Sequence, residues 1–148
     1  MSPFLLAALT LSSPPLAQTS FDKVRLPLDA TKLMSVHYLP FRVSTGGAMS
    51  IELISKRPSE LSLFNAPQRE RFVRFLSGVR SPDEGFSAAL TRLVLIFRGG
   101  AIYSVDQAGN VRYDDGKTKR DFVLTAPTFT KVESFLTILK NGSEPPID

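Results

Sequence analysis

Acidic side chains gather in one stretch of the sequence, where Asp114, Asp115 and Asp121 are interleaved with basic residues. Paired carboxylates can serve as the acid and base of a glycosidase or can bind calcium. The neighbouring cations would neutralise these acids, and the alternating oxygen ligands of a calcium loop are missing. We therefore expect a solvated hairpin loop whose charges pair with one another. An enzyme that uses Asp114, Asp115 and Glu52 is kept as an alternative.

A single histidine and a glycine-rich loop are the other features that suggest chemistry. His37 has no second imidazole with which to bind a metal, and no serine and carboxylate are marked out to join it. We expect it to be structural or on the surface. A phosphate-binding loop at 46–48 would have to open a helix, but the residues that follow alternate like a strand. A hydrolase elbow needs Gly-x-Ser-x-Gly, which neither Ser44 nor Ser50 provides. We interpret 46–48 as a hairpin turn and expect no catalytic residue, cofactor or metal.

Positive charge is concentrated in one segment of the chain. The sequence has 18 basic and 14 acidic residues, a net charge of +4 at pH 7, and segment 56–80 holds six basic residues against two acidic ones. This segment suits docking to an acidic protein, an anionic lipid face or nucleic acid, but a solvated helix face has the same composition. The net charge is small, and the aromatic residues fall at positions that are expected to face the core. Both features argue against a nucleic-acid partner. The candidate partner-binding residues are Lys56, Arg57, Arg69, Arg71, Arg74 and Arg80.

Two amphipathic helices are predicted by their first residues and by their apolar spacing. Asn65 can cap the first helix with Gln68 at the capping-box position, and Thr125 can cap the second. Apolar residues then recur at i, i+3, i+4 and i+7, which places them on one helical face. The stripes are Phe72, Phe75, Leu76 and Val79 in the first helix, and Val132, Phe135, Leu136 and Leu139 in the second.

Strands are predicted where apolar and polar residues alternate. These segments are 41–45 and 49–53, which flank the glycine loop, and 101–105 and 110–114, which flank a turn at 106–110. Segment 23–28 also alternates, but Pro27 confines it to a sheet edge. The unbroken apolar run 93–97 predicts a central strand covered on both faces.

The sequence also resembles itself at a spacing of 60 residues. Residues 31–79 align with 91–139 with eight identical pairs among 49, and the predicted turns and helices coincide. We therefore predict an α+β fold of two tandem related antiparallel units. Each has about four strands and then one amphipathic helix, with the helices packed on one face of the sheet or sheets.

The first twenty residues differ from the rest of the chain. An apolar run, Phe4–Leu11, is followed by a Ser/Pro-rich step and Ala17, with no charge before Asp22. This order is typical of a secretory signal peptide, although no basic residue precedes the apolar run. The alternative is an uncleaved N-terminal arm that packs on the domain or on a partner. The run is too short for a transmembrane helix, which needs about 20 residues. The expected divisions are a signal-like segment 1–20, units 21–80 and 86–141, a linker 81–85 and a flexible tail 142–148.

These features together favour a small exported binding protein without enzymatic activity, periplasmic or secreted. It would be inhibitor-like or accessory, or a peripheral subunit of a larger assembly, and would dock to another protein or an anionic surface through the basic helix. A carboxylate-dependent enzyme and a nucleic-acid-binding module are the alternatives. The chain has no cysteine, so it has neither disulfides nor a thiolate metal site.

Overall fold

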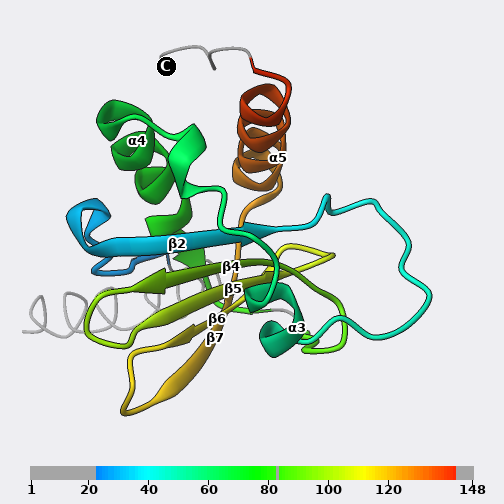
Figure 1. Cartoon of the computed structure of the whole chain (residues 1–148). Helices are drawn as coiled ribbons and strands as arrows, with labels where there is room; N and C mark the ends of the chain where they lie inside the picture. Colours follow the sequence, from blue (N-terminus) through cyan, green and yellow to red (C-terminus); the bar gives the residue numbers. More distant parts are fainter. Residues whose placement is uncertain (1–22, 83, 143–148) are drawn as a thin grey trace, which may run out of the picture.

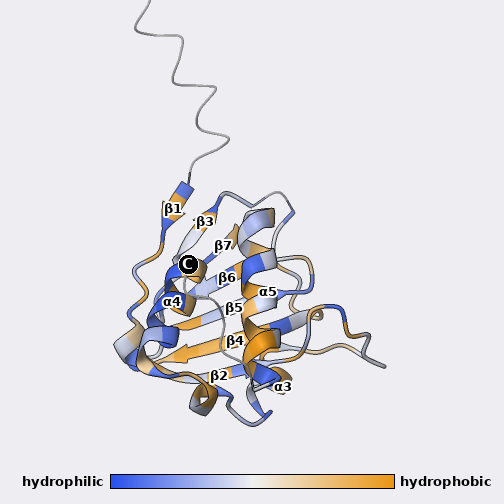
Figure 2. Ribbon diagram, turned by 90° about the horizontal axis from the view of Figure 1, so that it is seen from above, coloured by the Kyte–Doolittle hydropathy of each residue, from blue (hydrophilic) through white to orange (hydrophobic). Residues whose placement is uncertain are grey.

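A computed structural model describes residues 23–82 and 84–142; the predicted signal-like segment and positions 143–148 of the predicted tail lie outside these residues. The described chain forms one antiparallel sheet (Figure 1) of seven strands, in the order β1-β3-β7-β6-β5-β4-β2 (Figure 2). The strands are β1 Lys23–Arg25, β2 Leu33–Tyr38, β3 Gly78–Arg80, β4 Thr91–Phe97, β5 Ile102–Asp106, β6 Asn110–Asp114 and β7 Lys119–Val123. The helices are α3 Ile51–Ser55, α4 Ala66–Ser77 and α5 Ala126–Lys140, with 3-10 turns η1 Ala30–Lys32 and η2 Leu61–Leu63. The predicted α+β class and antiparallel pairing are confirmed.

The two halves of the chain contribute to a single sheet. Strands β4 to β7 form a continuous meander, and the strands of the first half are added at both of its ends. β2 pairs with β4 at one edge, while β3 pairs with β7 and carries β1 at the other. Only β1 and β2 precede α4 in the described chain, so the predicted pair of tandem four-strand units is not confirmed.

Both predicted helices form, and they cover the same face of the sheet (Figure 2). The main core lies between these two helices and the sheet. In it, the rings of Phe72 of α4 and Phe135 of α5 stack with their centroids 5.6 Å apart. Leu95 of β4 and Val111 of β6 contribute from the sheet. The apolar stripes therefore face the core as predicted, except that Val79 does not belong to the first helix: α4 ends at Ser77, and Val79 is a buried residue of β3.

The opposite face of the sheet is covered near β4 by α3, a helix that the sequence did not predict. Ile54 of α3 and Val94 of β4 are buried but lie outside the main core. Leu93 and Leu95 on either side of Val94 belong to the main core. This alternation confirms that β4 is covered on both faces, as its unbroken apolar run predicts. β1 is confirmed as an edge strand.

The predicted strands at 41–45 and 49–53 are wrong. Residues 39–50 form an irregular connection, and 51–55 is helical because the Ser50 hydroxyl accepts a hydrogen bond from the Leu53 amide as an N-cap. Burial of Ile54 fixes the helix against the sheet. The guanidinium of Arg92, itself buried, donates to the Val43 carbonyl at 3.2 Å and holds the connection in place. The glycines at 46 and 47 therefore do not form a hairpin turn between strands.

Candidate functional site

The helix that carries the basic residues begins at a capping box. The Asn65 side chain accepts from the Gln68 amide at 2.9 Å, and the Gln68 side chain accepts from the Asn65 amide at the same distance. Phe72 and Leu76 are buried in the core and fix the orientation of α4. The opposite side of the helix is consequently left for polar and charged residues.

A groove lies between this polar side of α4 and the segment that runs from β1 through η1. Its cavity volume is about 620 Å³, within the range of about 300–1,000 Å³ typical of ligand pockets. Apolar side chains from both walls line part of it, including Leu26 and Leu28 from the segment and Val73 from α4. The charged residues that line it are Arg25, Asp29, Arg69, Glu70 and Arg74.

The three arginines of the groove have no partner in the described part of the chain. The guanidinium groups of Arg25, Arg69 and Arg74 form no hydrogen bond or ion pair there, and the Nε of Arg69 is buried without an acceptor. A buried guanidinium donor without an acceptor is unfavourable. An incoming carboxylate would satisfy it with charge-assisted hydrogen bonds.

The two acids of the groove differ in how they are engaged. The Asp29 carboxylate accepts from the Thr31 hydroxyl at 2.7 Å and from the Thr31 amide at 2.9 Å as the N-cap of η1. These hydrogen bonds hold the pKa of Asp29 below its usual value. Glu70 is exposed on α4. The lining of the groove therefore has a small net positive charge and contains residues of both signs.

The structure divides the predicted basic residues. Arg69 and Arg74 line the groove, whereas the other four do not. Lys56 is exposed at the end of α3, and Arg57 donates from Nε to the Tyr38 carbonyl at 3.3 Å. Arg71 and Arg80 are both half-buried and make interactions of their own. Sequence reasoning missed Arg25, because its place beside α4 depends on the pairing of β1 with β3.

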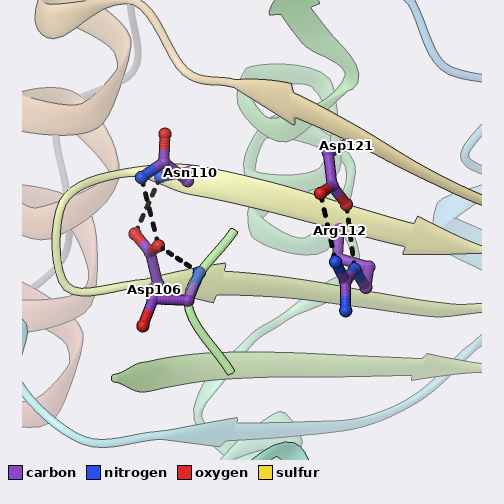
Figure 3. A network of polar contacts seen from close by, with 5 residues as sticks. Asp106, Asn110, Arg112 and Asp121 are labelled. Atoms are coloured by element: carbon purple, nitrogen blue, oxygen red, sulfur yellow. Dashed lines mark hydrogen bonds and ion pairs between the residues drawn. The ribbon is translucent and has the colours of Figure 1, made fainter. Parts of the chain in front are cut away.

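The clustered carboxylates are engaged in structural contacts. Asp121 pairs with Arg112 on the adjacent strand through oxygens 2.8 and 3.1 Å from the guanidinium nitrogens (Figure 3). Hydrogen bonding from Arg112 lowers the pKa of Asp121. Asp114 and Asp115 accept hydrogen bonds from amides of the turn between β6 and β7, and those from Thr118 and Lys117 lower the pKa of Asp115. The expected hairpin loop is present, but its acids bond to backbone amides and to Arg112 instead of pairing with the interleaved cations.

A second polar network on the same sheet shapes the turn between β5 and β6. The buried Asp106 carboxylate accepts hydrogen bonds from the amides of Ser87, Ala108 and Asn110 at 2.9 Å and from the Asn110 side chain at 3.1 Å (Figure 3). This confirms the predicted turn at 106–110. It also ties the connection after β3 to the sheet through Ser87.

His37 is structural, as expected. Its ring is buried, and Nδ1 donates to the Arg57 carbonyl at 2.7 Å, which holds the segment after α3 along the edge of β2. No cluster of acidic and histidine side chains suited to a metal ion occurs within 23–82 and 84–142. In the same ranges, no helix is both long and apolar enough to cross a bilayer.

Comparison with protein families, with curated proteins and with solved structures finds no match to this chain.

Proposed function

We propose that this protein is a small binding module without enzymatic activity, which docks an anionic protein partner at the groove beside α4. The observation that carries the proposal is that Arg25, Arg69 and Arg74 line one groove together with apolar residues, while their guanidinium groups form no hydrogen bond or ion pair within the described residues. Arginine is enriched at protein interfaces, where its planar guanidinium pairs with carboxylates through two parallel hydrogen bonds.

The carboxylate enzyme is the weaker candidate. Asp114 and Asp115 stabilise a turn, and Asp121 is paired with Arg112, so each of these acids already has a structural task. Glu52 lies on α3, whose contacts are with β2 and β4, whereas the turn acids lie between β6 and β7. These positions give no support for a pair of acids acting on one substrate.

Export remains part of the proposal and is supported by the sequence of residues 1–20 alone. We infer that the protein acts in the periplasm or outside the cell as an accessory or inhibitor-like partner of another protein. N-terminal sequencing of the native protein from each cell fraction tests this inference. A mature chain that begins near residue 20 in the exported fraction is expected, whereas an intact Met1 in the cytosol would contradict it.

Capture experiments with matched variants test the docking site. The wild type, Arg69→Gln/Arg74→Gln and Lys119→Gln/Lys131→Gln are immobilised and exposed to a native extract at low salt. Both doubles remove two positive charges, but Lys119 and Lys131 are exposed and do not line the groove. We expect a protein that the wild type and the lysine double variant retain and that the arginine double variant loses. Equal retention by all three would contradict the proposal.

A further inference from the structure

We propose that the groove seats one short peptide segment of the partner in which acidic side chains alternate with apolar ones. This inference rests on the proposed function and specifies the chemistry of the partner. The two kinds of lining residue motivate it: arginines supply sites for carboxylates, and the apolar side chains that line the same groove supply a seat for an aliphatic group.

The apolar part of the groove joins its two walls. Leu26 and Val73 are buried and come from the segment after β1 and from α4, while Leu28 is half-buried. All three belong to the main core or pack against it, so the seat is supported from beneath. A supported apolar surface can accept an aliphatic side chain without rearrangement.

The arginines are distributed over both walls. Arg25 belongs to β1, and Arg69 and Arg74 belong to α4, so carboxylates on a bound segment can be met from either side. Arg69 is half-buried and its Nε is without an acceptor, which makes it the expected centre of the contact. Charged groups that become desolvated on binding contribute most at such central positions.

The acids of the groove narrow the choice of partner. Asp29 and Glu70 leave the five charged lining residues with a net charge of only +1. A nucleic acid or an anionic membrane presents a dense row of negative charges, which Glu70 would repel. A segment with a few spaced carboxylates and intervening apolar groups matches the mixed lining better.

Three labelled heptapeptides test the inference by fluorescence anisotropy on the full chain at pH 7. They alternate Glu with Leu, Glu with Ser, and Gln with Leu, so that the second lacks the apolar groups and the third lacks the charges. We expect the Glu/Leu peptide to bind at least about 10-fold more tightly than either of the others. Its affinity should fall about 10-fold in Arg69→Gln/Arg74→Gln and less than about twofold in Lys119→Gln/Lys131→Gln.

A separate variant tests the apolar part of the groove. Leu28→Ser removes aliphatic surface from a half-buried position and should weaken the Glu/Leu peptide about fivefold while leaving the Glu/Ser peptide unchanged. Circular dichroism and thermal melting of each variant establish that it is folded before its affinity is compared.

The outcomes separate this inference from the proposed function. Equal binding of the Glu/Leu and Glu/Ser peptides, lost in the arginine variant, would overturn the apolar seat and leave anionic docking intact. Binding of the Gln/Leu peptide as tightly as the Glu/Leu peptide, insensitive to the arginine variant, would contradict both. Absence of binding by all three would overturn the peptide seat. Displacement of the probe by single-stranded DNA or anionic vesicles at lower concentration than by unlabelled peptide would also overturn it.

Discussion

A buried hydrogen bond between the sheet and α4 gives a sharp prediction about stability. The Tyr103 hydroxyl donates to the Leu76 carbonyl at 2.7 Å, and Tyr103 is 0 % exposed. This carbonyl belongs to the last turn of α4, where no later helical amide can reach it. Tyr103→Phe keeps the ring in the core but leaves the carbonyl without this donor, so we expect a loss of about 2 kcal/mol in the free energy of unfolding.

Equilibrium unfolding in urea measures the loss, and Tyr113→Phe is the matched control. Tyr113 is also buried, but its hydroxyl makes no hydrogen bond within the described chain, so its removal should cost less than about 0.5 kcal/mol. Equal losses in the two variants, or a Tyr103→Phe variant as stable as the wild type, would refute the reasoning.

The same contact predicts a dependence on alkaline pH. Burial raises the pKa of Tyr103 well above 10 in the folded state. Because the folded pKa is the higher one, the stability from keeping this phenol neutral is fully present below the unfolded pKa of about 10 and is lost as the pH rises further. Tyr103→Phe should therefore show a shallower loss of stability above pH 10 than the wild type, as measured by urea unfolding at each pH.

Two further predictions concern a glycine and an ion pair. Gly109→Ala should destabilise the protein by about 1 kcal/mol more than Gly116→Ala in urea unfolding. Both glycines have positive φ, 89° and 93°, but an added Cβ at Gly109 would lie 3.3 Å from the Phe129 ring and the one at Gly116 meets nothing within 4 Å; equal costs would refute the steric reasoning. Asp121, whose folded pKa is lowered by its hydrogen bonds with Arg112, stabilises the fold above its unfolded pKa of about 4, and this contribution is lost as the pH falls further. Because the pair is partly exposed, Asp121→Asn should lower the free energy of unfolding by about 1 kcal/mol at pH 7. The variant should also lose less stability than the wild type as the pH falls below about 4 in urea unfolding, and an unchanged loss would contradict this assignment.

The elements that the sequence predicted well are those whose signals are local and mutually consistent. α4 has a capping residue, a capping-box partner and an apolar stripe, and all three act within one helix. The turn between β5 and β6 is likewise fixed by Asp106, which bonds to amides two and four residues later. Such contacts can be inferred without knowledge of distant neighbours.

Segment 49–53 shows why other predictions failed. Five residues that alternate in polarity fit a strand, yet a helical turn also places Ile51 and Ile54 on one side. The decision depends on burial of Ile54 against the far face of the sheet, and on the contact of Arg92 with the loop before α3. Both are tertiary contacts that a five-residue pattern does not contain.

The candidate site was only partly predictable for the same reason. The sequence located an excess of positive charge around α4, and two members of that set, Arg69 and Arg74, line the groove. Its other wall comes from residues 25–31, which reach α4 only because β1 pairs with β3 at the end of the sheet. The groove is therefore a product of the strand order, which sequence spacing did not reveal.

Photo-crosslinking from the groove tests docking most directly. Because the natural chain has no cysteine, Glu70→Cys and Lys131→Cys each provide one attachment site for a benzophenone label. Glu70 lines the groove on α4, whereas Lys131 is exposed on α5 and lies outside the groove lining. In native extract, we expect an adduct with a partner protein from position 70 that is suppressed by Arg69→Gln/Arg74→Gln, and little or none from position 131. Equal adduct yields from both positions, or a position-70 adduct unaffected by the arginine variant, would contradict docking at this groove.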